Sequence, residues 1–202
     1  MVVNHSVVIN KHTIARDSVL LMQDVHLQPE DLYRNLGCNY PKFFKMDILC
    51  KWAWLGAEYL FSGNDDLYKG LDKNKIAVML ATSRGCIDVD KRYYDSIAMP
   101  SPSLFVYTLP NIMLGEISIR HGFKGEQLCM VNEQPDFDEM YFNINEFLNH
   151  KGMDACLCGW ADAAEGHYDV CLFWITKSGS GIECTPGLMK QLYNPGVDHR
   201  TR

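Results

Sequence analysis

The chain has 202 residues, of which 47% are hydrophobic and 22% charged, as expected for a single globular domain spanning residues 1–202. Its formal net charge of −6 at pH 7 argues against nucleic acid and anionic membranes as the main partner. The eight cysteines lie mostly within apolar runs, without a disulfide-rich framework, which favours reduced thiols in a cytoplasmic protein. We recognise no signal peptide and no apolar run long enough to span a bilayer.

The first part of the chain predicts two short strands and one long helix. Apolar runs at Val7–Ile9 and Val19–Met22 indicate the strands. Asp47 is placed to cap a helix over Ile48–Phe61, whose apolar residues form a wide stripe. The two tryptophans of this helix are two residues apart, so we expect them to face different surfaces.

The middle of the chain predicts an alternation of strands and helices. Ile76–Ala81 is typical of a buried strand, and Asp88–Ile97 is helical or irregular. Asn111–Ile119 has the periodicity of an amphipathic helix. A turn with two glycines follows, and then Gln127–Asn132 forms a short apolar run suited to a buried strand.

The next feature is a sharp junction, Glu133–Asp136, between that strand and a helix that runs to about Lys151. Pro135 suits the first helical position, and acidic residues follow it where a helix N-terminus favours negative charge. Many enzymes place a nucleophile at such a corner, because the helix N-terminus lowers the pKa of a thiol or stabilises an oxyanion. The residue at this corner is Gln134.

The last part predicts two further core strands. One contains Cys156 and Cys158, which point to the same face of the sheet, and the other spans Tyr168–Thr176. The one-residue gap between the two cysteines is not the usual zinc spacing, so we expect them in the core and predict no metal and no cofactor. From about residue 186 we expect a mobile tail.

Several short motifs follow one another in an order and spacing that resemble the N-terminal half of the β-ketoacyl synthases, which have the thiolase fold. The resemblance covers roughly Tyr40 to Ala163. Its motifs are Phe43–Asp47, Val78–Gly85, Pro110-Asn111, Gly115, Ile117–Ile119, Gly122–Gly125, Gly152–Ala155 and Gly159.

This resemblance implies an α/β fold, one thiolase-like half with a mixed β-sheet and helices on both faces. Counted from Gly125, the position of the family's active-site cysteine is Gln134. Glu133 and Gln134 together resemble the Glu-Gln pair of chain-length factors, the inactive partners of ketosynthases. The ketosynthase histidines belong to the C-terminal half of that fold, which this sequence does not contain.

The resemblance also implies where substrate and partner would bind. Phe105 and Asn111 occupy positions that in the family lie near the acyl pocket and the dimer interface. In the thiolase fold one strand pairs with its counterpart in the other subunit, so that a single sheet crosses the dimer. Here the residues of that strand are Leu128, Cys129, Met130 and Val131.

The chemistry of the corner argues against covalent catalysis. Gln134 carries a neutral amide, which cannot form an acyl-enzyme but can donate a hydrogen bond to a thioester carbonyl. Cys129, the nearest thiol, lies within an apolar run, so we interpret it as a small buried residue.

Four other polar residues could suggest a catalytic site, but each has a simpler interpretation. His121 and His167 fall in predicted turns, and without a nucleophile to pair with we expect both to be exposed. Asp162 and Glu165 are assigned to a solvated loop.

These observations leave three hypotheses. The first is a non-catalytic, chain-length-factor-like subunit of a fatty-acid or polyketide-type pathway, acting as a homodimer or paired with a ketosynthase, with acyl carrier protein as a further partner. The second is a small acyl-thioester enzyme, either 3-oxoacyl-[acyl-carrier-protein] synthase-like or a malonyl decarboxylase. In the third, the chain is one half of a split ketosynthase. The missing nucleophile favours the first.

Overall fold

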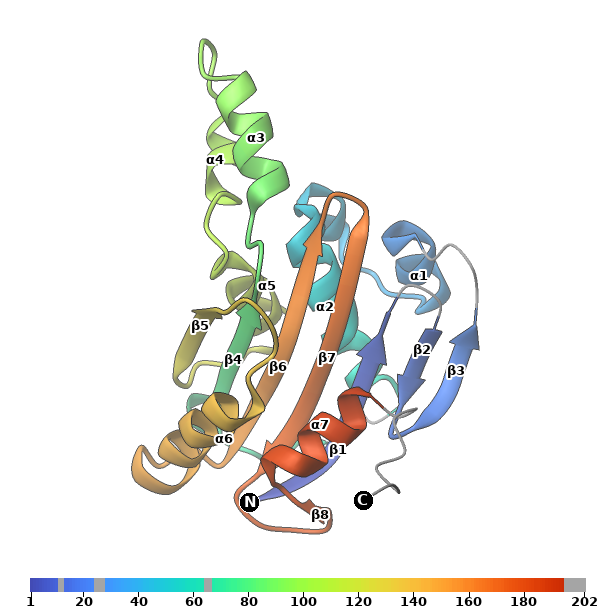
Figure 1. The fold of residues 1–202 in the computed structure, drawn as a ribbon, viewed down its shortest axis with the longest axis vertical. Helices are drawn as coiled ribbons and strands as arrows, with labels where there is room; N and C mark the ends of the chain where they lie inside the picture. Colours follow the sequence, from blue (N-terminus) through green and yellow to red (C-terminus); the bar gives the residue numbers. More distant parts are fainter. Residues whose placement is uncertain (11–12, 24–27, 64–66, 195–202) are drawn as a thin grey trace.

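A computed structural model describes residues 1–10, 13–23, 28–63 and 67–194. These residues form a mixed eight-stranded sheet of order β3-β2-β1-β7-β6-β4-β5, with β8 also paired to β1 (Figure 1). The strands are β1 (Val2–Ile9), β2 (Thr13–Arg16), β3 (Val19–Gln23), β4 (Ile76–Thr82), β5 (Gln127–Val131), β6 (Ala155–Ala164), β7 (His167–Thr176) and β8 (Ile182–Glu183). The α-helices are α1 (Pro29–Asn35), α2 (Ile48–Phe61), α3 (Ile87–Asp95), α4 (Pro102–Val106), α5 (Ile112–His121), α6 (Phe137–Asn145) and α7 (Pro186–Tyr193). Shorter turns of helix are η1 (Pro41–Lys45), η2 (Lys73–Lys75) and the π-helical η3 (Glu146–His150).

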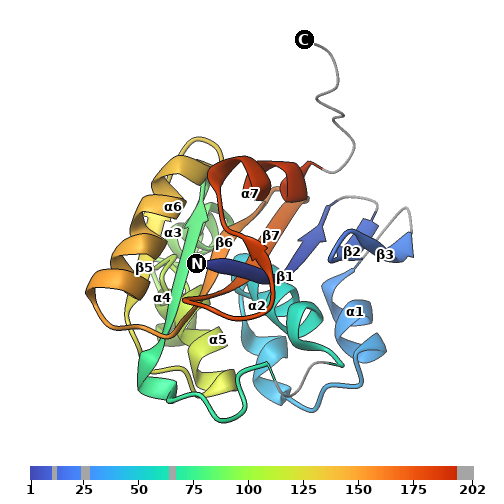
Figure 2. The ribbon, with the colours of Figure 1, turned by 90° about the horizontal axis from the view of Figure 1, so that it is seen from below.

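The sheet has helices on both faces, which confirms the predicted α/β class. Figure 2 shows α6 and α7 on one side of the strands and α1, α2 and α5 on the other. β4 pairs in parallel with β5 and β6, whereas β7 is antiparallel to both β6 and β1. Each face has its own hydrophobic cluster, and β5 forms one edge of the sheet.

Helix α2 is buried on nearly all sides, and its ends agree with the prediction. The Asp47 side chain caps it by accepting hydrogen bonds from the backbone N–H groups of Leu49 and Cys50. Trp52 and Trp54 do face different surfaces, as expected. The Trp52 ring stacks 3.8 Å from Tyr168 on β7, and Trp54 packs among the aromatic residues of α1 and η1, namely Tyr33, Phe43 and the neighbouring Tyr40.

The strand-to-helix corner lies where the sequence places it, with one correction. The N-cap of α6 is Asp136, and the helix begins at Phe137, so Pro135 precedes the cap and does not occupy the first helical position. The Asp136 carboxylate accepts a hydrogen bond from the Glu139 N–H, which satisfies one free donor at the helix start. Helical structure continues through η3 to His150, close to the expected end.

The segment Ile87–Val106, comprising α3 and α4, projects beyond the end of the sheet, and we call it the arm (Figure 1). Its two helices contact each other through Tyr93 and Phe105, whose ring centroids lie 5.5 Å apart. Several of its large apolar side chains are exposed, the most exposed being Tyr94 at 75% and Met99 at 86%. The arm therefore places apolar surface in solvent.

The expectation of a mobile tail from about residue 186 is wrong for the part that the structure describes. Pro186–Tyr193 forms α7, which begins with a cap in which Thr185 Oγ1 accepts the Leu188 N–H, and Met189 is fully buried. Residues 195–202 lie outside the described residues. Within the described residues, no helix combines the length and the apolar character needed to cross a bilayer.

Candidate functional site

The candidate site lies where the parallel strands end. In open α/β sheets, ligands bind outside the carboxyl ends of the strands. Here the corner Asn132–Asp136 leaves β5, the loop beginning at Ser83 leaves β4, and β6 runs alongside. Two adjoining hollows of about 690 and 520 Å³ share Glu133, Gln134 and Pro135.

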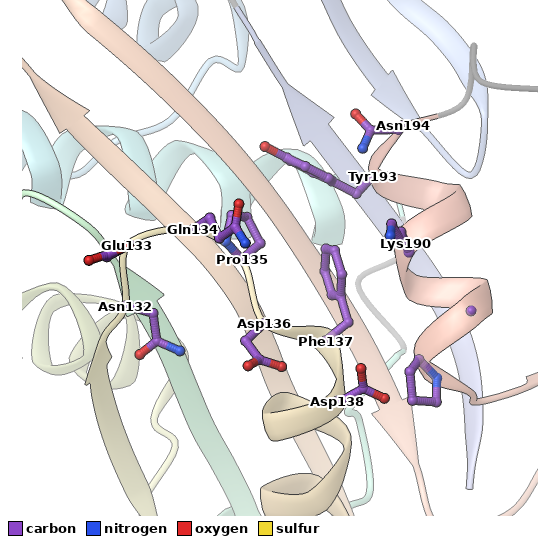
Figure 3. Close-up of a pocket in the computed structure, with 12 residues that line it drawn as sticks. Asn132, Glu133, Gln134, Pro135, Asp136, Phe137, Asp138, Lys190, Tyr193 and Asn194 are labelled. Carbon is purple, nitrogen blue, oxygen red and sulfur yellow. The ribbon is translucent and has the colours of Figure 1, made fainter.

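The larger hollow lies between the corner and α7 (Figure 3). Gln134 and Glu133 are both exposed on its rim, so the predicted corner residues are accessible to a ligand. On the opposite side of the hollow, α7 contributes Lys190 and Tyr193. Neither residue was predicted from the sequence, because a mobile tail was expected there.

The start of α6 carries several negative charges. Asp136 caps the helix, and Asp138 and Glu139 occupy its first turn. The Asn132 amide donates to Glu139 Oε2 over 2.6 Å, which holds that carboxylate close to the corner. Because these carboxylates already complement the positive end of the helix, the corner favours neutral ligands over thiolates and phosphates.

Asp162 is buried within β6, so its assignment to a solvated loop is wrong. One carboxylate oxygen, Oδ1, accepts from Thr82 Oγ1 at 3.0 Å, Ser83 N at 3.0 Å and Arg84 N at 2.9 Å. The other, Oδ2, lies 3.1 Å from Arg84 Nε and 3.0 Å from Arg84 Nη2. Burial alone would raise the pKa of Asp162, but the donors of Arg84 and Ser83 outweigh it and lower that pKa. Glu165 is exposed, as expected, but lies in the tight β6–β7 turn.

A second carboxylate, that of the half-buried Asp169, connects the sheet to α7. The Tyr193 hydroxyl donates to Asp169 Oδ2 on β7. Burial and the nearby charge of Asp162 raise the pKa of Asp169, and burial together with the Asp169 contact raises that of Tyr193. This bond joins the lining of the larger hollow, at Tyr193, to that of the smaller one, at Asp169.

His121 is buried, so its assignment to an exposed turn is also wrong. It ends α5 and packs against α2, with only 6% of its side chain exposed. Its Nδ1 lies 2.9 Å from the Tyr68 hydroxyl, and its Nε2 lies 3.3 Å from Glu58 Oε1 without hydrogen-bond alignment. Arg120 donates two hydrogen bonds to Glu58. His167, at the start of β7, is exposed as expected.

The cysteines resemble core residues more than nucleophiles. Cys156 and Cys158 are fully buried, which confirms their prediction. Cys129 is half-buried, and burial raises its pKa to about 11. Among the described residues, no group of three or more histidine, cysteine, aspartate or glutamate side chains could hold a metal ion.

The residues assigned to an interface lie on the β5 edge and near the arm. In β5, Leu128 and Cys129 are half-buried, Met130 packs into the core at 8% exposure, and Val131 is 64% exposed. The residues predicted to bind substrate are Phe105 on α4, which is 53% exposed, and Asn111, which is exposed at the start of α5. Neither Phe105 nor Asn111 lines the two hollows at the corner.

Comparison with known proteins by sequence finds no family model and no curated protein that matches the chain. Comparison by structure finds several. The ishigamide ketosynthase/chain length factor aligns with a TM-score of 0.61 and 11% identity, over 88% of this chain and 62% of that one. The complex of a type II PKS acyl-carrier protein with its hexaketide-bound ketosynthase (AntDE:AntF) gives 0.60 and 12%, over 87% and 62%. The ketosynthase ApeO in complex with its chain length factor ApeC, from Xenorhabdus doucetiae, gives 0.59 and 10%, over 96% and 89%.

At these identities the likeness shows the fold alone. The chain spans 62% of the length of two of these structures, but 89% of a chain in the ApeO–ApeC complex. The chain therefore has the thiolase-like fold of ketosynthases and chain length factors, as its motifs predict.

Proposed function

We propose that this protein is a non-catalytic, chain-length-factor-like subunit that pairs with a ketosynthase in a polyketide or fatty-acid type of pathway. One observation carries the proposal: exposed apolar side chains gather around the β5 edge and along the arm. Helices α5 and α6 flank that edge on the two faces of the sheet (Figure 2). The exposed residues are Ile97 at 58%, Met99 at 86%, Phe105 at 53%, Ile119 at 64%, Val131 at 64% and Phe142 at 62%.

The β5 edge supports pairing for a physical reason. An edge strand leaves backbone N–H and C=O groups free to template another strand, and natural edges are usually protected by lysine, proline or a bulge. Between Gln127 and Val131 there is neither lysine nor proline. A partner strand would satisfy these groups and cover Val131, and with the arm such an interface would reach the roughly 2,000 Å² of obligate pairs.

The corner supports a non-catalytic role. Gln134 offers no nucleophile, and the acidic start of α6 would oppose a thiolate at that position. Cys129 and Cys86 have pKa values raised by burial to about 11 and 12, respectively, so neither is an activated thiol.

A basic hollow fits the acyl carrier protein as a further partner. It measures about 460 Å³ and is lined by Lys45, Arg92, Ser101 and Ser103, among others. Neither Lys45 nor Arg92 forms an ion pair with any residue that the structure describes. Asp47 also lines the hollow, but its carboxylate is buried as the cap of α2. On a protein of net charge −6, two cations without an ion pair among the described residues favour an anionic partner.

The test measures two properties, association of the chain with a ketosynthase and reaction of the chain alone with acyl thioesters. The chain is co-expressed with a ketosynthase encoded beside it, and the mixture is analysed by light scattering coupled to size exclusion. We expect a stable complex, and we expect the chain alone to form no acyl adduct with acyl and malonyl thioesters by intact-mass spectrometry. A soluble 23.1 kDa monomer that does not bind the ketosynthase would contradict the proposed pairing. An acyl adduct that malonyl thioester removes would contradict the non-catalytic role.

A further inference from the structure

The chain leaves the sheet after β4 to form the arm, and a buried carboxylate contacts it at that exit. Directly after β4, the backbone N–H groups of Ser83 and Arg84 both donate to Asp162 Oδ1, at 3.0 and 2.9 Å. The Thr82 hydroxyl donates to the same oxygen, and the Arg84 guanidinium pairs with Oδ2. Asp162 is only 6% exposed, so these donors replace water and make strong, charge-assisted bonds.

A second contact holds the arm one helical turn further out. At the tip of the β6–β7 hairpin, the Glu165 N–H donates to Asp88 Oδ2 at 2.9 Å, and the Glu165 carboxylate pairs with Lys91. Asp88 and Lys91 both belong to α3. Glu165 and Gly166 have φ values of 54° and 78°, the left-handed turn that brings the hairpin tip to this position. The hairpin thus makes contacts at two levels, one with the loop that leads to the arm and one with α3 itself.

At its other end the arm is connected to the body by contacts of a different kind. Tyr107, just after α4, donates a hydrogen bond of 3.1 Å to Glu116 Oε1 on α5. Beyond these anchors, the outer residues Tyr94, Ile97 and Met99 are exposed. Val89 also packs α3 against the core, with 1% exposure. The polar contacts that direct α3 relative to the sheet come from the β6–β7 hairpin, which lies far away in sequence.

We propose that Asp162 is a positioning residue that sets the direction of the arm for docking on the partner subunit. This inference rests on the proposed function. Asp162 lies beside the corner, but its donors are Thr82 at the end of β4 and Ser83 and Arg84 in the loop that leads from β4 to the arm. It therefore acts on the partner through the arm, without direct contact with a substrate. Preorganisation of the arm lowers the ordering cost of association, which is the physical gain.

Two variants test this on the full chain. Asp162→Asn keeps the shape but places an amide donor or a neutral oxygen opposite the Arg84 guanidinium. Asp88→Ala removes only the outer contact, at a half-buried position in the first turn of α3, and we expect it to leave the fold intact. Glu183→Gln, exposed on β8, removes the same charge elsewhere and serves as the control.

The first measurement is amide hydrogen exchange of the chain alone. In Asp162→Asn we expect exchange over residues 83–95 to accelerate about tenfold or more, with β4, β6 and β7 unchanged. Asp88→Ala should give a smaller acceleration confined to α3, and Glu183→Gln none. Unchanged exchange at 83–95, or an equal acceleration across the whole sheet, would overturn the positioning role.

The second measurement is affinity for the ketosynthase, by titration of the purified subunits. We expect Asp162→Asn to weaken association about tenfold and Asp88→Ala to weaken it less. If the arm loosens but affinity stays the same, docking does not use the arm, and the inference fails while pairing stands. If the wild-type chain does not bind the ketosynthase, the proposed function fails, and the exchange experiment still decides whether Asp162 positions the arm.

Discussion

Helix α2 and the arm are both helical and rich in apolar residues, yet they use these residues differently. In α2 the indole rings of Trp52 and Trp54 are at most 2% exposed, whereas in the arm Met99 is 86% and Tyr94 75% exposed. Burial of apolar area is what stabilises a fold, at roughly 25 cal/mol per Å². The apolar residues of α2 therefore stabilise the chain, and those of the arm are available to stabilise a complex.

The largest effect we expect is on stability, from Trp54→Ala. Removal of this fully buried ring leaves a cavity among Tyr33, Tyr40 and Phe43, and should lower the free energy of unfolding by about 3–5 kcal/mol. Urea denaturation measures the loss. The matched arm variant Met99→Ala should stay within about 0.5 kcal/mol of wild type. An arm variant as destabilising as the α2 variant would abolish the contrast between the two regions.

The next effect concerns Glu58, a buried carboxylate on α2 whose contribution to stability depends on pH. Burial would raise the pKa of Glu58, but the close approach of His121 and the hydrogen bonds from Arg120 outweigh it and lower this pKa to about 2, from an ordinary 4.5. A depressed carboxyl pKa stabilises the fold above the unfolded value, and the gain is lost as pH falls from about 4.5 towards 2.

Glu58→Gln should therefore cost about 3 kcal/mol of unfolding free energy at pH 6, and about half of that or less at pH 3. Urea denaturation at the two pH values measures both. Glu183→Gln, at an exposed position, should show no such difference. A cost that is equal at the two pH values would show that Glu58 acts through packing and not through its charge.

The third prediction separates the interface from the fold. Met130 packs into the core, so the exposed position for a charge on β5 is Val131. Val131→Lys should leave the unfolding free energy within about 0.5 kcal/mol of wild type and weaken ketosynthase binding about a hundredfold, because it buries an unpaired charge. Ile182→Lys, at a similarly exposed position on β8, should not affect binding. Equal effects of the two lysines would remove β5 from the interface.

The smallest effect concerns the corner. The sequence predicts that a helix N-terminus lowers the pKa of a thiol placed there. Because Asp136, Asp138 and Glu139 already complement this helix end, we expect the thiol of Gln134→Cys to keep a pKa of about 8.5 or higher. Alkylation rates against pH measure it. A pKa well below 8.5 would show that the helix N-terminus outweighs its carboxylates.

Local patterns predicted most of the elements, and distant contacts account for most of the errors. The cap at Asp47 and the periodicity after it placed α2 without any tertiary information, and the apolar run placed β5. His121 and Asp162 were assigned to the surface because their partners, Glu58 and Arg84, lie 63 and 78 residues away along the chain. No local pattern contains such a pairing.

Short elements were missed for a related reason. β2 spans only Thr13–Arg16 and α7 only Pro186–Tyr193, and segments of this length show too few turns of a pattern to identify. Their formation depends on tertiary packing, as shown by the burial of Ile14 and Met189. Because α7 was not predicted, its residue Tyr193 was not predicted to line the site either.

The order of strands in the sheet also affects how the chain folds during its synthesis. β1 begins at Val2, but apart from β2 its partners are β7 and β8, which begin at His167 and Ile182. A ribosome adds about 5–20 residues per second, so β1 lacks these partners for roughly 8–30 s during synthesis. For that interval the β1–β2–β3 unit, with Val19 and Leu20 exposed, is an isolated meander. We therefore expect the N-terminal strands to be prone to aggregation until β7 and β8 have been synthesised.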